Sequence, residues 1–264
     1  MKIPFTKAHG VHNDFLLTWK DTIAQPTPEI ARAICERHTG VGADGWILVE
    51  RGRGQCDAAI HLFKSDGSQA EISGNGTRCA AALLVEHGCT GNDIRIRTGA
   101  GLKHLRLTGR AGLLFTFEMN MGEPEVREPR YNLRLAAGSR DVTVVWVGNP
   151  QCAVPVDDFD FDWRTVGAEI ESHPDFPKRT NVSFLKPVDE HTIDVRFYER
   201  GAGETMSSGT GSTGAVAAAI ARGIVRSPVR VLTPAGPLDL RAEGPIFLTG
   251  PAEIIAVGEF LMGQ

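Results

Sequence analysis

The sequence has no long apolar run and no excess of positive charge. None of its hydrophobic stretches approaches the roughly 20 residues of a membrane-spanning helix, and its first residues contain no apolar segment typical of a signal peptide. The formal net charge of −4 argues against a nucleic-acid partner and gives no reason to expect binding to a membrane surface. We therefore expect a cytoplasmic protein with neither kind of partner.

Signals for cofactors are also missing. The five cysteines, an odd number, do not have the spacing of a zinc site, and the eight histidines are scattered. No Walker pattern for phosphate binding occurs. We expect reduced thiols and no metal, nucleotide or flavin cofactor.

An alanine-rich segment that follows a glycine-rich turn occurs twice. Residues 63–88 align without a gap with residues 198–223, at a constant offset of 135 positions. The alignment places Ser73 opposite Ser208, each directly before a Gly-x-Gly sequence, and Asn13 falls opposite Asn149 with one further residue of offset. In a chain of 264 residues, 42% of them hydrophobic, this predicts one domain duplicated into two, each large enough for its own core.

Each repeat predicts a central helix that begins after its serine and ends at Gly88 or Gly223. The second of these segments carries no charge from Gly209 to Ala221, so we expect that helix to be buried. The N-terminus of a helix has unpaired backbone N–H groups and the positive end of the helix dipole. We therefore expect both helix entrances to attract an anion.

Alternating apolar residues predict many short strands around the two helices, including 245–249 and a closing strand near 252–260, but none from 120 to 141 or from 148 to 162. We predict an α+β fold with two pseudo-symmetric domains, each a curved mixed or antiparallel sheet wrapped around its central helix. The first domain is expected at 1–117, joined by a C-terminal strand at 252–264, and the second at 118–251. Thr27 and Pro28 predict the start of a further helix, which we expect to end near His38.

Seven short motifs follow one another along the chain. They are His12-Asn-Asp-Phe15, Arg37 to Asp44, Asp66-Gly-Ser with Gly74 to Arg78, Gly148 to Pro150, Tyr198 to Glu204, Gly209 to Gly211, and Thr249 to Pro251. In this order the set resembles the diaminopimelate epimerase family. The resemblance implies a cofactor-independent isomerase of the lysine and peptidoglycan precursor pathway that converts LL- to meso-diaminopimelate. It also implies an active site in the cleft between the two domains, and commonly a homodimer.

The resemblance assigns catalysis to two cysteines, one of which takes the Cα proton while the other delivers a proton from the opposite face. This chain has Ser73 and Ser208 at those positions, and Gln151 where the family has a histidine. A thiol has a pKa of about 8.5, whereas a serine hydroxyl is a far weaker acid that needs an adjacent base. Gln151 cannot supply that base, and we expect Cys79 and Cys152 to lie in the core.

The same resemblance assigns the substrate-holding positions. The positions that match residues binding the distal amine and carboxylate of the substrate are Asn13, Asn149, Asn181, Glu199 and Arg200. The positions that match residues binding the α-carboxylate are Gly74, Asn75, Gly209 and Thr210. Lys64 replaces an asparagine of the family. Because Lys64 aligns with Glu199 in the repeat, we expect the two to come within ion-pair reach, which would alter the distal group accepted.

Three functions remain open at this point. The chain could be an epimerase impaired by its two serines, or a divergent relative that carries out elimination or one-sided proton transfer on another amino acid. It could also be a non-catalytic protein that binds an amino acid or another anion. The differences at Lys64 and Gln151 favour natural divergence over a laboratory change confined to the two catalytic positions.

Overall fold

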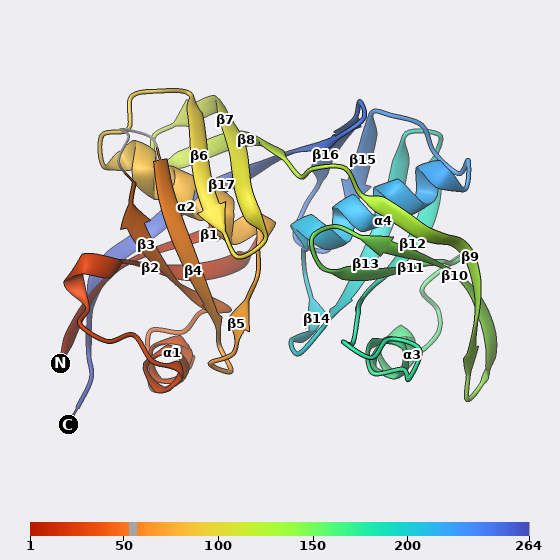
Figure 1. Cartoon of the computed structure of the whole chain (residues 1–264), viewed down its shortest axis with the longest axis horizontal. Coiled ribbons are helices and arrows are strands. Elements are labelled where there is room, and N and C mark those ends of the chain that lie inside the picture. The colour runs from red at the N-terminus through yellow and green to blue at the C-terminus, as the bar shows by residue number, and fades with distance from the viewer. Residues whose placement is uncertain (53–56, 264) are drawn as a thin grey trace. The chain divides into compact units, whose positions relative to one another are not determined.

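The computed structural model describes residues 1–52 and 57–263. The chain divides into two compact units, Met1–Met119 with Gly250–Gln264, and Asn120–Thr249 (Figure 1). We call them unit 1 and unit 2 and describe each by itself. Within the described residues, no helix is both long enough and apolar enough to cross a membrane.

Unit 1 is a ring of strands closed around one helix. Pairing runs β1–β2–β3–β4–β6–β7–β8–β17 and returns from β17 to β1, with β2–β3 and β4–β6 parallel. Its helix α2 is buried over its first eleven residues. The elements are β1 (Lys2–Gly10), β2 (Asn13–Trp19), the 3-10 turn η1 (Lys20–Thr22), α1 (Pro28–Cys35), β3 (Gly45–Arg51), β4 (Asp57–Lys64), β5 (Gln69–Ala70), α2 (Gly74–Glu86), β6 (Asp93–Thr98), β7 (Gly101–Ala111), β8 (Leu114–Asn120) and the second part of β17 (Ile246–Leu261).

Helix α1 covers the outer face of this ring. Its buried residues pack with Leu16, Trp46 and Leu48 in one apolar cluster, whereas Phe15 and Ile47 point inward to α2. Strands β2 and β3 are thus buried on both faces, which explains their nearly continuous apolar sequences.

The start of α1 is as predicted, but its end is not. The Thr27 hydroxyl accepts a hydrogen bond from the Ile30 amide, and Pro28 is the first helical residue. The helix ends at Cys35 and not near His38, because Glu36 is already extended. The amides of Val41 and Gly42 then fold back to bind the Ile34 carbonyl and finish the helix.

Unit 2 repeats this arrangement. Pairing runs β9–β10–β11–β12–β13–β15–β16–β17, with β11–β12 and β13–β15 parallel, α4 is the buried helix, and α3 packs on an outer apolar cluster. The elements are β9 (Glu125–Leu135), β10 (Gly138–Trp146), β11 (Pro150–Pro155), α3 (Trp163–Glu171), β12 (Asn181–Asp189), β13 (Thr192–Glu199), β14 (Gly203–Thr205), α4 (Gly209–Ala221), β15 (Val229–Leu232), β16 (Leu238–Ala242) and the first part of β17.

The two central helices correspond in detail, as the repeat predicts. Each has 13 residues, begins after its serine, and is followed by a glycine with positive φ, 96° at Gly88 and 68° at Gly223. Such a glycine ends a helix without the steric cost that a side chain would add. The predicted mixed α+β fold, with a curved sheet around a central helix in each half, is confirmed.

The cysteines divide into three groups. Cys35, Cys79 and Cys152 are free and buried, and burial raises the pKa of each thiol to about 12. The expectation that Cys79 and Cys152 lie in the core is confirmed. Cys89, however, is disulfide-bonded, so the expectation of reduced thiols throughout is wrong there; Cys56 lies outside the described residues. Spacing along the sequence does not reveal which thiols a fold brings together.

Candidate active site

The two serines of the repeat are the N-caps of the two central helices. The Ser73 hydroxyl accepts a hydrogen bond from the Gly76 amide at 3.0 Å, and the Ser208 hydroxyl accepts one from Gly211 at 3.0 Å. Both serines have extended backbones, as N-cap residues do. Each helix therefore starts with a hydroxyl beside its open amides.

Close packing explains the glycines in each first turn. A Cβ at Gly76 would lie 2.8 Å from Ile47 Cδ1, and one at Gly211 would lie 2.8 Å from Phe197 Cδ1 and 2.9 Å from the Ser208 hydroxyl. Helix geometry leaves the preceding amides without an acceptor inside the helix. They belong to four predicted binding residues: Gly74, Asn75, Gly209 and Thr210.

The Ser208 hydroxyl has a carboxylate partner. It donates a hydrogen bond of 2.6 Å to Oε1 of Glu199, the last residue of β13. The hairpin of β13 and β14 brings the two together, since Glu199 pairs with Gly203 shortly before α4 begins. Ser208 is only 4% exposed, so water competes little for this bond. A serine paired with a carboxylate has the adjacent base that proton transfer needs.

The loop that carries Glu199 is held by buried polar side chains. Oδ1 of Asn181 accepts a hydrogen bond from the Arg200 amide at 2.9 Å, and its Nδ2 donates to the Pro150 carbonyl at 3.1 Å. Glu171, 2% exposed, accepts a bond from the Gly201 amide and pairs with Arg179. Asn181, predicted as a binding residue, thus also fixes the Glu199 loop in place.

Asn149, Gln151 and Thr210 form a second group in unit 2. Nε2 of Gln151 donates to Oδ1 of Asn149 at 2.8 Å, and Nδ2 of Asn149 lies 3.5 Å from the Thr210 hydroxyl. Gln151 is 1% exposed and packs against α4. A Cβ added at Gly214 of that helix would lie 3.0 Å from the Cβ of Gln151. Gln151 therefore orients Asn149 and is not a base, as its chemistry predicts.

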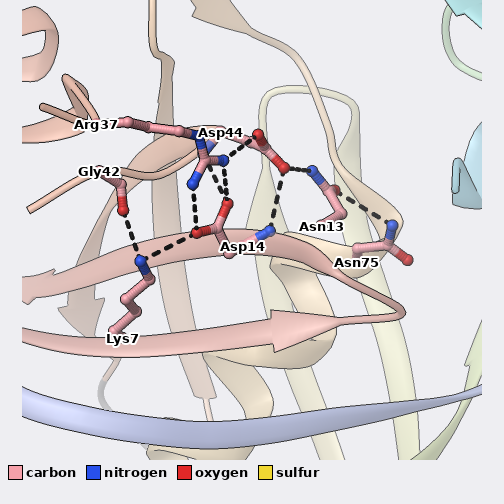
Figure 2. A network of polar contacts seen from close by, with 7 residues as sticks. All are labelled: Lys7, Asn13, Asp14, Arg37, Gly42, Asp44 and Asn75. Carbon is pink, nitrogen blue, oxygen red and sulfur yellow. Dashed lines mark hydrogen bonds and ion pairs between the residues drawn. The ribbon is translucent and has the colours of Figure 1, made fainter. Parts of the chain in front are cut away.

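Unit 1 holds Asn13, the counterpart of Asn149, and Asn75 in a charged network (Figure 2). Nδ2 of Asn75 donates to Oδ1 of Asn13 at 3.2 Å, and Nδ2 of Asn13 donates to Oδ2 of Asp44 at 2.6 Å. The Arg37 guanidinium bridges Asp44 and Asp14.

Asp14 is the anchor of this network. Its carboxylate takes two hydrogen bonds from Arg37 and an ion pair of 3.1 Å from Lys7, whose ammonium also binds the Gly42 carbonyl. Burial alone would raise the pKa of Asp14, but the bonds from Arg37 and Lys7 outweigh it and hold that pKa below its usual value. Asp14 is therefore ionised at neutral pH.

Arg78, on α2, joins this network through Asn75. The side chain is fully buried, with Nε bonded to the Pro251 carbonyl at 3.1 Å and one amino group bonded to Oδ1 of Asn75 at 2.6 Å. Among the described residues its other amino group, Nη1, has no hydrogen-bond partner. Burial lowers the pKa of Arg78 to about 10, so it is charged at neutral pH.

Lys64 ends β4, in the position equivalent to Glu199. Its backbone pairs with Gly45 and with the Ser68 carbonyl, and its side chain is half-buried. Its predicted pairing with Glu199 stays a prediction.

Two kinds of cofactor site, for a metal ion and for a dinucleotide, can be tested against the described residues. The described residues contain no group of three or more His, Cys, Asp or Glu that could hold a metal ion. Gly209, Gly211 and Gly214 have the Gly-x-Gly-x-x-Gly spacing of dinucleotide sites, which the expectation of no nucleotide cofactor overlooked. That motif needs a preceding parallel strand, whereas β14 pairs antiparallel with β13, and Gly214 makes room for Gln151.

Sequence reasoning missed several residues of these networks. It treated Glu199 as a substrate contact and overlooked it as the partner of Ser208. Asp14, Arg37, Asp44 and Arg78 lie inside the matched motifs, but no function was assigned to them. In a sequence, charged residues next to glycines are typical of solvent-exposed turns. Only the fold shows that these side chains contact one another.

Comparisons with known proteins place the chain in a family. The family model for diaminopimelate epimerase matches residues 5–126 and 143–255. The diaminopimelate epimerase of Nitrosospira multiformis is 38% identical, covering 98% of each chain, and that of Pelotomaculum thermopropionicum is 38% identical, covering 97% of this chain and 98% of its own. A hydroxyproline epimerase from Agrobacterium vitis shares the fold, with a TM-score of 0.77 at 16% identity, covering 98% of this chain and 92% of its own.

These matches extend over nearly the whole chain and agree with the order of the seven motifs. The relatives are named epimerases, so the chain is an enzyme of the cofactor-independent epimerase and racemase type. It belongs to the diaminopimelate epimerase family.

Proposed function

We propose that this protein is an amino-acid isomerase of the diaminopimelate epimerase type in which Ser208 and Glu199 carry out proton transfer at one face of the substrate Cα. Ser73 is assigned to the other face, where proton transfer is much slower. The substrate is an α-amino acid, with diaminopimelate the first to test. The observation that carries the proposal is the hydrogen bond of 2.6 Å from Ser208 to Glu199.

The proposed step moves one proton through two oxygens. The Ser208 hydroxyl gives its proton to Glu199 as its oxygen takes the proton of Cα, so the Cα–H bond breaks and Glu199 becomes protonated. The electron pair stays on the substrate as an enolate. The return of a solvent-derived proton by the same path exchanges the Cα hydrogen without inversion, whereas a proton from Ser73 gives the epimer.

Ser73 is the weaker partner in this scheme. Among the described residues, its hydroxyl accepts the capping bond from Gly76 and has no hydrogen-bonded carboxylate. The position equivalent to Glu199 is Lys64, which carries the opposite charge. To give the epimer Ser73 must donate a proton, and a serine hydroxyl is a weak acid that, without a base, is also a poor proton acceptor at neutral pH. We therefore expect one-sided exchange to be faster than epimerisation.

The helix entrances suit the substrate carboxylate. The amides before Gly76 and Gly211 have no acceptor within their helices, and the helix dipole places positive potential there. The same amides stabilise the negative charge that develops when Cα loses its proton. We assign the α-carboxylate to these amides.

A homodimer in the cytoplasm completes the proposal. Three exposed apolar side chains, Ile255, Val257 and Leu261, lie on the last part of β17 and suit contact with a second copy. Light scattering coupled to gel filtration gives the mass in solution. A monomeric mass at micromolar concentration would remove this part without affecting the proposed chemistry.

Incubation in D₂O with LL- or meso-diaminopimelate tests the function. Proton NMR follows the loss of the Cα signal, and chiral chromatography follows epimer formation in the same sample. We expect exchange clearly ahead of epimerisation. Epimerisation as fast as exchange would contradict the proposal, and calorimetric binding without any exchange would instead indicate a non-catalytic binding protein.

A further inference from the structure

Asn13 and Asn75, the two asparagines of the unit 1 site, belong to a hydrogen-bonded chain with a charge at each end. It runs from Arg78 to Asn75, on to Asn13 and then to Asp44, with bonds of 2.6, 3.2 and 2.6 Å (Figure 2 shows the last two). Arg78 and Asn75 are 0% and 1% exposed, so water does not compete at that end.

The two end groups allow only one donor-to-acceptor direction in this series of hydrogen bonds. A guanidinium can only donate hydrogen bonds, so Asn75 must turn its oxygen to Arg78 and its NH₂ group to Asn13. An ionised carboxylate can only accept, so Asn13 must turn its NH₂ group to Asp44 and its oxygen to Asn75. Both ends require the same orientation of both amides. Turning either amide over would place two acceptors or two donors against each other.

Unit 2 has no such charges at the equivalent positions. At the offset of 135, Thr210 stands in place of Asn75 and Thr213 in place of Arg78. Thr180 stands in place of Asp44, because it precedes Asn181 of β12, which pairs with Gln151 as Gly45 of β3 pairs with Phe15. Asn149, the counterpart of Asn13, is oriented by the neutral amide of Gln151, whose own oxygen is buried without a partner in the described structure. The charge-imposed direction is therefore a property of unit 1.

Retaining Arg78 is costly to the fold. The side chain is fully buried and charged, its described hydrogen bonds go to a carbonyl and an amide, and Nη1 has no described partner. A buried charge without a counter-ion destabilises a protein, and an apolar residue of similar size would avoid the penalty. A role in the site explains why an arginine stands there.

We propose that Arg78 and Asp44 are positioning residues that act through Asn75 and Asn13 and set the direction in which these amides meet the substrate. In that direction Asn13 keeps one N–H for a substrate acceptor such as a carboxylate oxygen. Asp44 is itself held by Arg37, whose amino group bonds its second oxygen at 2.8 Å. The inference rests on the proposed function insofar as the ligand is an amino acid.

The test uses Asp44→Asn, Arg78→Met and Arg78→Lys in the full chain, with Asp93→Asn and Arg97→Gln as exposed controls in unit 1. Loss of a charge-assisted hydrogen bond corresponds to about 10- to 100-fold in affinity. We expect KM for diaminopimelate exchange to rise by that factor in Arg78→Met, with a much smaller change in kcat. Arg78→Lys, which keeps the charge and a donor, restores part of the loss.

Side-chain amide NMR gives a readout that needs no turnover. In ¹⁵N-labelled native protein, Asn13 and Asn75 should each give one pair of NH₂ signals. The double variant Asp44→Asn with Arg78→Gln replaces both charges by amides that can donate or accept, so its Asn13 signals should shift and double. If Arg78→Met does not fold, this double variant still decides the matter. Unchanged signals together with unchanged KM would overturn the inference. If the native chain shows no turnover, the function fails while the NMR result still judges the positioning roles.

Discussion

The Ser208 hydroxyl donates a hydrogen bond of 2.6 Å to Glu199, whereas the equivalent serine of unit 1, Ser73, has Lys64 at the position of that glutamate. Both serines cap their helices in the same way. Both halves thus share the capping geometry, but the residue that pairs with the hydroxyl in unit 2 is replaced by one of opposite charge in unit 1. This difference is the physical reason to expect unequal chemistry at the two faces of the substrate.

Restoring the family residues should restore the family reaction. In the triple variant Ser73→Cys, Ser208→Cys and Gln151→His, both thiols are more acidic than the hydroxyls they replace. We expect epimerisation of LL-diaminopimelate to rise by about 10²-fold or more, the range of general acid–base assistance. A folded triple variant that shows neither epimerisation nor exchange would indicate that the substrate is a different amino acid.

Replacing either capping serine by alanine should also lower stability. Each variant loses a bond to the first turn of its helix, and the free energy of unfolding should fall by about 1 kcal/mol. Urea titration followed by circular dichroism measures the change. Ser→Gly at the same positions is the matched control, because glycine costs only a few tenths of a kcal/mol as an N-cap. Equal losses for alanine and glycine would argue against a capping role.

Asp14 should make the stability of unit 1 depend on pH. Its pKa is lowered in the folded protein, so its contribution is complete above the unfolded pKa of about 4 and is lost as pH falls through the folded value. Asp14→Asn should therefore cost about 1–3 kcal/mol at pH 7 and progressively less below pH 4. Asp93→Asn is the exposed control. A loss that is the same at pH 7 and pH 3 would show that the charge is not responsible.

Lys64→Asn should change which amino acids bind. The variant removes a positive charge from a position predicted to lie near the distal group of the substrate. We expect affinity to shift, by about tenfold, toward amino acids with a distal ammonium group, since one like-charge contact is removed. Calorimetry with a series of amino acids measures the shift, and Lys2→Asn is a control at a side chain that is 70% exposed. An unchanged ligand profile would show that Lys64 does not set selectivity.

The sequence predicted the parts of the fold that repeat or alternate. The central helices follow from the duplicated alanine-rich segments, and most strands follow from their alternation. Strand β9 was missed because it is largely exposed, carries many charges and contains Pro129. Strand β11 was missed because a proline stands at each of its ends. Strand β17 was predicted as two strands, because Gly250-Pro251 resembles a turn, but it continues from unit 2 into unit 1.

The sequence motifs indicated which residues to place at the candidate site, but not the contacts that these residues make. The motifs located both serines and the asparagines, since these residues have fixed places around the helix entrances. The pairing of Ser208 with Glu199 depends on a hairpin geometry that no spacing rule specifies. Likewise Asp14, Asp44, Arg37 and Arg78 come from three separate parts of the chain, namely β2, the loop between α1 and β3, and α2. Only the folded chain shows that their charges meet.

The most direct test of the proposed chemistry is the rate of Cα deuterium exchange on LL-diaminopimelate in the native chain and in Glu199→Gln. Glu204→Gln is the matched control, because Glu204 lies in the same hairpin but pairs with Arg164 at the surface. Glutamine keeps the size of the side chain and cannot accept the proton from Ser208. We predict a loss of about 10²–10⁴-fold in exchange for Glu199→Gln, and native exchange for the control. Exchange in Glu199→Gln within a factor of about two of the native rate would contradict the assignment of Glu199 as the base of Ser208.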